Sequence, residues 1–76
     1  MKTVDKNKIA AEFGAFIREA REKQGLLQVD IAEQLGVGRP YYSHIESGSR
    51  NVYFTTALNI CNILGLDIRD FAKRLK

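Results

Sequence analysis

Side chains with hydrogen-bonding groups recur at helical spacing in the middle of the chain. Arg39, Ser43 and Ser47 are four residues apart, and so are Pro40 and His44, so a helix presents all five on one side. Arginine offers a planar fork of donors, whereas serine and histidine can each donate and accept. Such a face suits recognition of a polar partner. It does not suit catalysis, because no second base or nucleophile accompanies His44.

The elements that position this face follow from the spacing of apolar residues and from capping residues and glycines. Apolar residues recur at helical intervals, and no segment alternates with period two long enough to form a strand. Asp5 and Asp67 are candidate helix caps, and Gly25 is a candidate helix stop. The sequence therefore predicts an all-α, five-helix bundle, with helices over about 6–24, 28–35, 40–47, 55–64 and 68–73.

Length and composition limit what the chain does. Its 76 residues fit one small domain, which we expect to span 1–76. Twelve basic and nine acidic residues give a net charge of +3, which admits an anionic partner without demanding one. The charges are scattered, with no dense basic block. No paired carboxylates, catalytic triad or phosphate-binding loop is present, so we expect no enzyme activity and no small-molecule ligand.

The single cysteine and single histidine narrow the chemistry further. Cys61 has no partner for a disulfide, and with His44 alone it cannot form an ordinary zinc site, so we expect no metal and no cofactor. It lies on the apolar stripe of the 55–64 helix, so we expect it in the core. No segment approaches 18 consecutive apolar residues, and residues 1–10 lack the apolar stretch of a signal peptide. We expect a cytoplasmic protein without a membrane span.

The helices at 28–35 and 40–47 are short and lie one tight turn apart, which forces a steep crossing and predicts a helix-turn-helix at about 28–47. Counted from Gln28, Ala32, Gly36, Tyr42 and Ile45 fill positions five, nine, fifteen and eighteen of that motif. A small residue, a turn glycine and an inward aliphatic residue are the expected types. Tyr42 stands where valine or isoleucine is usual.

Longer stretches extend this similarity. They read REKQGLLQ at 21–28, IAEQLGV at 31–37, YYSHIESG at 41–48 and ALNICNILGL at 57–66. Together the stretches resemble the Xre/Cro family of phage-repressor-like DNA-binding domains over about residues 9–73. A chain of this size also resembles the small controller proteins of restriction–modification systems.

The resemblance implies that the 40–47 helix enters the major groove of double-stranded DNA. Arg39 would then grip guanine, Ser43 and His44 would read base edges, and Pro40 would touch a thymine methyl group. Phosphate contacts are expected from Gln28, Tyr41, Arg50 and Asn51. The alternatives are that Arg39 is merely solvated and that Gln28 only marks a polar helix start.

Two residues depart from the family. Leu27 replaces a capping threonine or serine, and Pro40 replaces a polar residue. Proline disfavours helical geometry in the residue before it, so we expect the third helix to start at Pro40, with Arg39 as its cap.

Glu46 lies on the inward side of the same helix, where a carboxylate needs a partner. The resemblance implies that Arg21 is that partner, in a structural ion pair. The alternative is that both side chains are exposed.

One short recognition helix makes few base contacts, so we expect a homodimer that binds a palindromic operator. The apolar residues left off the core stripes are candidates for the interface: Leu58, Ile63, Leu66 and Ile68. The alternative is that they complete the core. The leading hypothesis is a transcriptional regulator, and the rival is an antitoxin-like or accessory protein-interaction module with the same fold.

Overall fold

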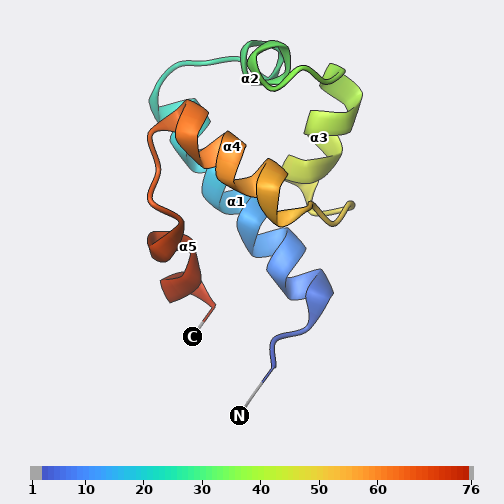
Figure 1. The fold of residues 1–76 in the computed structure, drawn as a ribbon, viewed down its shortest axis with the longest axis vertical. Coiled ribbons are helices and arrows are strands. Elements are labelled where there is room, and N and C mark those ends of the chain that lie inside the picture. The colour runs from blue at the N-terminus through green and yellow to red at the C-terminus, as the bar shows by residue number, and fades with distance from the viewer. Residues whose placement is uncertain (1–2, 76) are drawn as a thin grey trace.

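The computed structural model describes residues 3–75, which form five α-helices and no strand. In chain order they are α1 (Lys6–Lys23), α2 (Gln28–Leu35), α3 (Arg39–Ser47), α4 (Phe54–Leu64) and α5 (Ile68–Arg74). Figure 1 shows α4 in front of α1 at the centre of the molecule, while α2 and α3 occupy the end away from α5. None of the five helices has the length and apolar character needed to cross a bilayer. The predicted all-α, five-helix bundle is confirmed.

Side-chain caps define two of the helix starts, as the sequence predicts. Asp5 accepts a hydrogen bond from the backbone N–H of Asn7 at 2.6 Å, and Asp67 accepts one from Arg69 at 2.9 Å. Helix α2 starts differently, because Leu27 has no side-chain acceptor. The Asp30 carboxylate accepts the N–H of Leu27 at 2.7 Å, so α2 has one half of a capping box.

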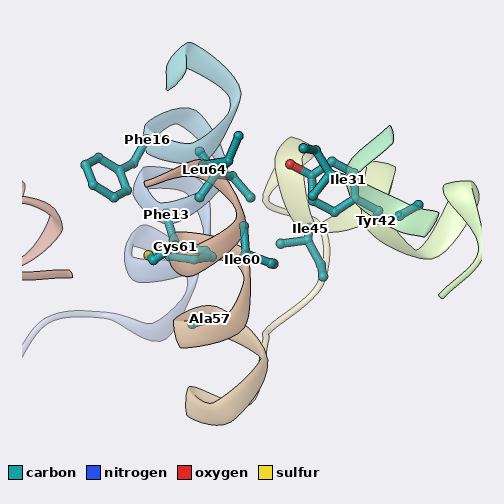
Figure 2. Packing of buried hydrophobic residues seen from close by; sticks show 11 residues of the cluster. Phe13, Phe16, Ile31, Tyr42, Ile45, Ala57, Ile60, Cys61 and Leu64 are labelled. Carbon is teal, nitrogen blue, oxygen red and sulfur yellow. The ribbon is translucent and has the colours of Figure 1, made fainter. Parts of the chain in front are cut away.

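The core is a single apolar cluster to which α1, α2, α3 and α4 contribute. In Figure 2, Ile31 and Tyr42 lie together on the α2–α3 side, and Ile45 connects them to Ile60 on α4. Cys61 is buried with them, as predicted. The inward face of α3 is therefore fixed against the rest of the bundle, which leaves its opposite face to solvent.

Helix α5 attaches to the core mainly through Phe71, with Ile68 also packed against the core. Phe71 packs edge-on against Phe13, with ring centroids 5.2 Å apart, and also contacts Phe16. Arg74 adds ion pairs to Glu12 and Glu19, at 3.5 and 2.8 Å. Partly exposed pairs of this kind contribute little to stability, so the apolar contacts of Phe71 and Ile68 hold α5 in place.

The end of α3 sits unusually close to α1. A Cβ atom on Gly14 would collide with the carbonyl oxygen of Glu46 and lie 2.6 Å from that of Ile45. Gly48, in the left-handed conformation with φ of +77°, would collide in the same way with Ala11. Glycine at both positions lets the α3 backbone rest directly on α1.

This close approach reverses the usual effect of a helical glycine. A Gly-to-Ala change inside a helix ordinarily stabilises it by about 1 kcal/mol. We expect Gly14→Ala to destabilise the protein by about 1–3 kcal/mol instead, because the new methyl group pushes α3 away from α1. Thermal unfolding followed by circular dichroism measures the change, and an increase in Tm would contradict this account.

Candidate nucleic-acid interface

The outward face of α3 is open to solvent. Arg39, Pro40, His44 and Ser47 are exposed and Ser43 is half-buried, whereas Tyr42 and Ile45 are fully buried on the other side. Among residues 39–51 the only acidic residue is Glu46, and it is buried. The face therefore combines polar hydrogen-bonding groups with positive charge at both ends, where Arg39 and Arg50 lie. The remaining residues predicted to contact DNA are half-buried or exposed: Gln28, Tyr41, Arg50 and Asn51.

The expected start of α3 is wrong by one residue. Gly38 is the N-cap, with extended backbone, and Arg39 is the first helical residue, with Pro40 at the second position. Proline is tolerated there because no N–H in the first turn has an intrahelical partner. Arg39 thus takes helical geometry despite the steric bias that Pro40 exerts on the residue before it.

Arg21 and Glu46 form a buried ion pair. The Nε atom of Arg21 donates to Glu46 Oε2 at 2.7 Å, and a terminal guanidinium nitrogen donates to Oε1 at 3.1 Å. The remaining terminal nitrogen donates to the carbonyl oxygen of Leu26 at 2.7 Å. The two residues are 9% and 5% exposed, so the alternative of two solvated side chains is wrong. One guanidinium group thus connects α1, α3 and the loop before α2.

Gln28 extends this pair to the surface, which the sequence did not predict. Its Nε2 donates to Glu46 Oε1 at 3.0 Å, and its Oε1 accepts from a terminal nitrogen of Arg39 at 3.1 Å. The amide is half-buried and already engaged at both ends, rather than projecting freely toward a phosphate. Its orientation follows from its partners, because only the NH₂ group can donate to a carboxylate.

The pKa of the Glu46 carboxyl reflects two opposing effects. Burial raises it, but the hydrogen bonds from Arg21 and Gln28 outweigh burial, so the pKa is lowered. Burial raises the pKa of Tyr42, whose hydroxyl lies close enough to Glu46 to interact with it. That hydroxyl still makes no hydrogen bond of ordinary geometry to any residue in 3–75. The carboxylate is thus held in its ionised form by Arg21 and Gln28.

Two further arrangements lie at the other end of α3. The guanidinium of Arg50 stacks on the ring of Tyr41, 4.9 Å from its centroid. The imidazole of His44 contacts the hydroxyl of Ser49, which also lies 2.9 Å from the hydroxyl of Ser47. Sequence reasoning did not single out Ser49, because it lies in the loop after α3, and no helical spacing connects it to His44.

The four residues predicted for a dimer interface do not form one surface. Ile63, Leu66 and Ile68 pack partly against the core, so the premise that they lie off it is wrong for these three. Leu58 and Ile63 point about 140° apart around α4, since each helical residue turns by about 100°. Ile68 lines an apolar hollow with Phe54. Leu66 lines a separate hollow near Phe16.

Known proteins resemble this chain in both fold and sequence. The family model described as "Helix-turn-helix" matches residues 17–71. The chain belongs to the helix-turn-helix family. The resemblance to its Xre/Cro members, stated above from the sequence, is confirmed.

Curated relatives are named as regulators. The control protein C.MunI of a Mycoplasma species is 37% identical over 65 residues, which cover 84% of this chain and 88% of the relative. YqaE of Bacillus subtilis, an uncharacterised HTH-type transcriptional regulator, is 36% identical over 74% of this chain. The match spans only about half of YqaE, 48% of its length.

Solved structures agree with this assignment. The restriction-modification controller protein C.AhdI of Aeromonas hydrophila superposes with a TM-score of 0.75 and 32% identity, over 82% of this chain and 94% of that one. A single-substitution variant of the controller C.Esp1396I, bound to its highest-affinity operator site, gives a TM-score of 0.74 at 25% identity. That match covers 88% of each chain.

The buried pair generates a pH-dependent prediction. Because folding lowers the pKa of Glu46, its contribution is fully present above the unfolded value of about 4.3 and is lost as pH falls through the lower folded value. We expect Glu46→Gln to cost about 3–5 kcal/mol at pH 7, since it leaves the buried Arg21 charge uncompensated. The difference from the wild type should narrow as pH falls below about 4.

Urea unfolding across this pH range measures the effect. The control is Glu22→Gln, which breaks the exposed pair between Arg18 and Glu22 and should change stability by less than about 1 kcal/mol. An equal loss in both variants, or a gap that does not change with pH, would contradict the assigned role of Glu46.

Proposed function

We propose that this chain is a transcriptional regulator that recognises a specific double-stranded DNA sequence with α3 in the major groove. The observation that carries the proposal is the outward face of α3, which is exposed, lacks exposed acidic residues and presents hydrogen-bonding groups. The major groove is about 12 Å wide and admits a helix. The structure of the similar C.Esp1396I variant, which is bound to an operator site, supports the choice of DNA as the partner.

Within this proposal each part of the face has a distinct role. Arg39 reads guanine through the two acceptors O6 and N7, and Gln28 holds its guanidinium group in place. Ser43 and His44 face base edges further along the helix, with Pro40 and Ser47 beside them. Arg50, held on the ring of Tyr41, contacts a phosphate near Asn51. Base contacts set sequence preference, while phosphate contacts set affinity and register.

The proposal includes a homodimer that binds two half-sites of a palindrome, about 34–36 Å apart. Its interface is the surface around Phe54, where large apolar side chains are exposed: Ile9, Tyr53 and Phe54. The other large exposed apolar side chains of residues 3–75, Leu27 and Val29, lie at the start of α2. Beside Phe54 lies an apolar hollow of about 230 Å³ at the starts of α1, α4 and α5.

A second copy of the chain fits this surface. Two-fold contacts require a patch that is complementary to itself, and a projecting aromatic ring beside an apolar hollow meets that requirement. Tyr53 is 81% exposed and Phe54 69% exposed. Together, the two pairs of rings in a dimer would bury roughly 500–800 Å². That is a large share of the ~1,200–2,000 Å² in a stable interface. Of the residues predicted from sequence, Ile68 lines the hollow, and Leu58 lies one turn from Phe54.

Substitutions of Arg39 and Arg50 separate recognition of the DNA sequence from general affinity for DNA. We expect Arg39→Ala to relax the preference at one base position in each half-site, at a cost of about 1–3 kcal/mol per contact. Arg50→Ala should weaken binding to all DNA sequences alike and lower the salt dependence of binding. Selection of bound sequences from a random DNA pool, followed by titrations at several salt concentrations, measures both effects.

The controls are built into this pair of variants. An unchanged site preference in Arg39→Ala would refute its assignment as a base reader. If the wild type retards no DNA at any salt concentration, the rival function as a protein-interaction module is favoured instead.

Phe54→Ala tests the interface. We expect this change to raise the dimer Kd by at least about tenfold, because a buried aromatic anchor typically contributes well over 1 kcal/mol. Leu27→Ala is the matched control, since Leu27 is similarly exposed but is the N-cap residue of α2 and does not line the hollow beside Phe54. Sedimentation velocity at micromolar concentration gives the oligomeric state. A monomeric wild type, or equal effects of the two variants, would contradict the proposed interface.

A further inference from the structure

His44, the only histidine of the chain, is part of a short loop of polar contacts at the end of α3. Its Nδ1 lies 3.1 Å from the Ser49 hydroxyl, which lies 2.9 Å from the Ser47 hydroxyl. The Ser47 hydroxyl in turn donates to the carbonyl oxygen of His44 at 3.0 Å. The contacts begin on the imidazole of His44 and return to its backbone.

The number of available protons fixes the direction of these contacts. Three contacts connect Nδ1, two hydroxyl groups and a carbonyl oxygen, and each contact needs one proton. The hydroxyls of Ser47 and Ser49 supply one proton each, and the carbonyl supplies none. When all three contacts are hydrogen bonds, the third proton comes from Nδ1. The chain therefore runs from Nδ1–H to Ser49, from Ser49 to Ser47, and from Ser47 to the carbonyl oxygen.

The other assignment leaves a contact without a proton. If Nδ1 were bare and accepted from Ser49, then Ser47 could donate either to Ser49 or to the carbonyl oxygen of His44. One of the contacts of 2.9–3.0 Å would then bring lone pairs together. The Ser49 hydroxyl also approaches that carbonyl at 3.3 Å, and donation there likewise leaves Nδ1 as the donor to Ser49.

Capping of α3 does not explain why Ser49 approaches the imidazole. The backbone N–H groups of Gly48 and Ser49 already donate to the last carbonyl groups of the helix, including that of His44 at 3.1 Å. The Ser49 side chain is therefore not needed to end the helix. Its contact with Nδ1 fixes the tautomer of a ring on the outward face of α3.

We propose that Ser49 is a specificity-determining residue, which holds His44 as the Nδ1–H tautomer so that its Nε2 faces DNA as a hydrogen-bond acceptor. This inference rests on the proposed function. In the major groove the donors on base edges are the amino groups of adenine N6 and cytosine N4, whereas guanine and thymine present acceptors. Neutral His44 should therefore favour adenine or cytosine at the base that it contacts.

The tautomer can be measured without DNA. Uniformly ¹⁵N-labelled, untagged full chain at pH 8.5, where imidazole is neutral, gives a single histidine in long-range ¹H–¹⁵N correlation spectra. We expect a protonated-type signal for Nδ1 and a bare-type signal for Nε2. Ser49→Ala should shift the population toward Nε2–H, and Ser43→Ala, a hydroxyl of α3 outside these contacts, should not. A wild type in the Nε2–H form, or no shift in Ser49→Ala, overturns the inference.

Binding-site selection at the same pH tests the consequence for DNA. We expect the wild type to prefer adenine or cytosine at one position per half-site by about 5- to 100-fold, and Ser49→Ala to lose that preference while retaining the others. Selection of DNA with the same preferences in both proteins overturns this inference and leaves the proposed function intact. Failure of the wild type to select any sequence overturns both.

Discussion

The buried ion pair between Arg21 and Glu46 is the constraint on which the arrangement of α1, α2 and α3 depends. Leaving one charge unpaired in this position would cost about 3–5 kcal/mol, so the folded state strongly favours contact between the two residues. Arg21 comes from α1, Glu46 from α3, and the Leu26 carbonyl and Gln28 amide from the start of α2. Few relative placements of the three helices satisfy all these partners at once. The pair therefore restricts geometry more than it adds to stability, since an apolar pair of similar size is often at least as stable.

Backbone packing between α1 and α3 also determines the position of the outward face of α3. Glu46 follows Ile45, and the carbonyl groups of both rest on Gly14 of α1. This contact fixes the depth at which α3 sits on the bundle, while Tyr42 and Ile45 fix its rotation about its own axis. The depth and the rotation of α3 together determine where its outward residues lie. The backbone that carries the proposed recognition surface is thus positioned by the buried side of the helix.

Much of the fold could be predicted because local chemistry determines it. Asp5 and Asp67 cap the helices that they precede, and the 3.6-residue period places Tyr42 inside and His44 outside. What the sequence could not determine depends on side-chain direction and on loops that fold back. The amide of Gln28 is of a type that can bind a phosphate, but in this structure its NH₂ group donates to the buried carboxylate of Glu46. Ser49 returns to His44 only because Gly48 adopts a left-handed conformation.

The premise behind the predicted dimer interface, that its four residues lie off the core, fails for a different reason. Leu58, Ile63, Leu66 and Ile68 were grouped because they are apolar and close in sequence, yet α4 turns Leu58 and Ile63 to different sides. In a domain this small, residues at the edge of an apolar stripe are needed to complete the core, and three of the four do so. The more exposed aromatic rings lie before and at the start of α4, where Tyr53 and Phe54 have no core position to fill.

The contact between Gln28 and Arg39 bears on how an arginine at a helix start can discriminate between bases. A solvated arginine side chain loses about 2 kcal/mol of rotamer entropy when it is fixed. Here one terminal nitrogen of Arg39 is already held by an amide that is itself held by Glu46. A guanidinium group has five N–H donors, so this contact leaves enough of them for the two acceptors of guanine. In the proposed function, part of this ordering cost is therefore met before DNA binds. The buried carboxylate of Glu46 thus positions both the helices and the arginine that we propose to contact a base.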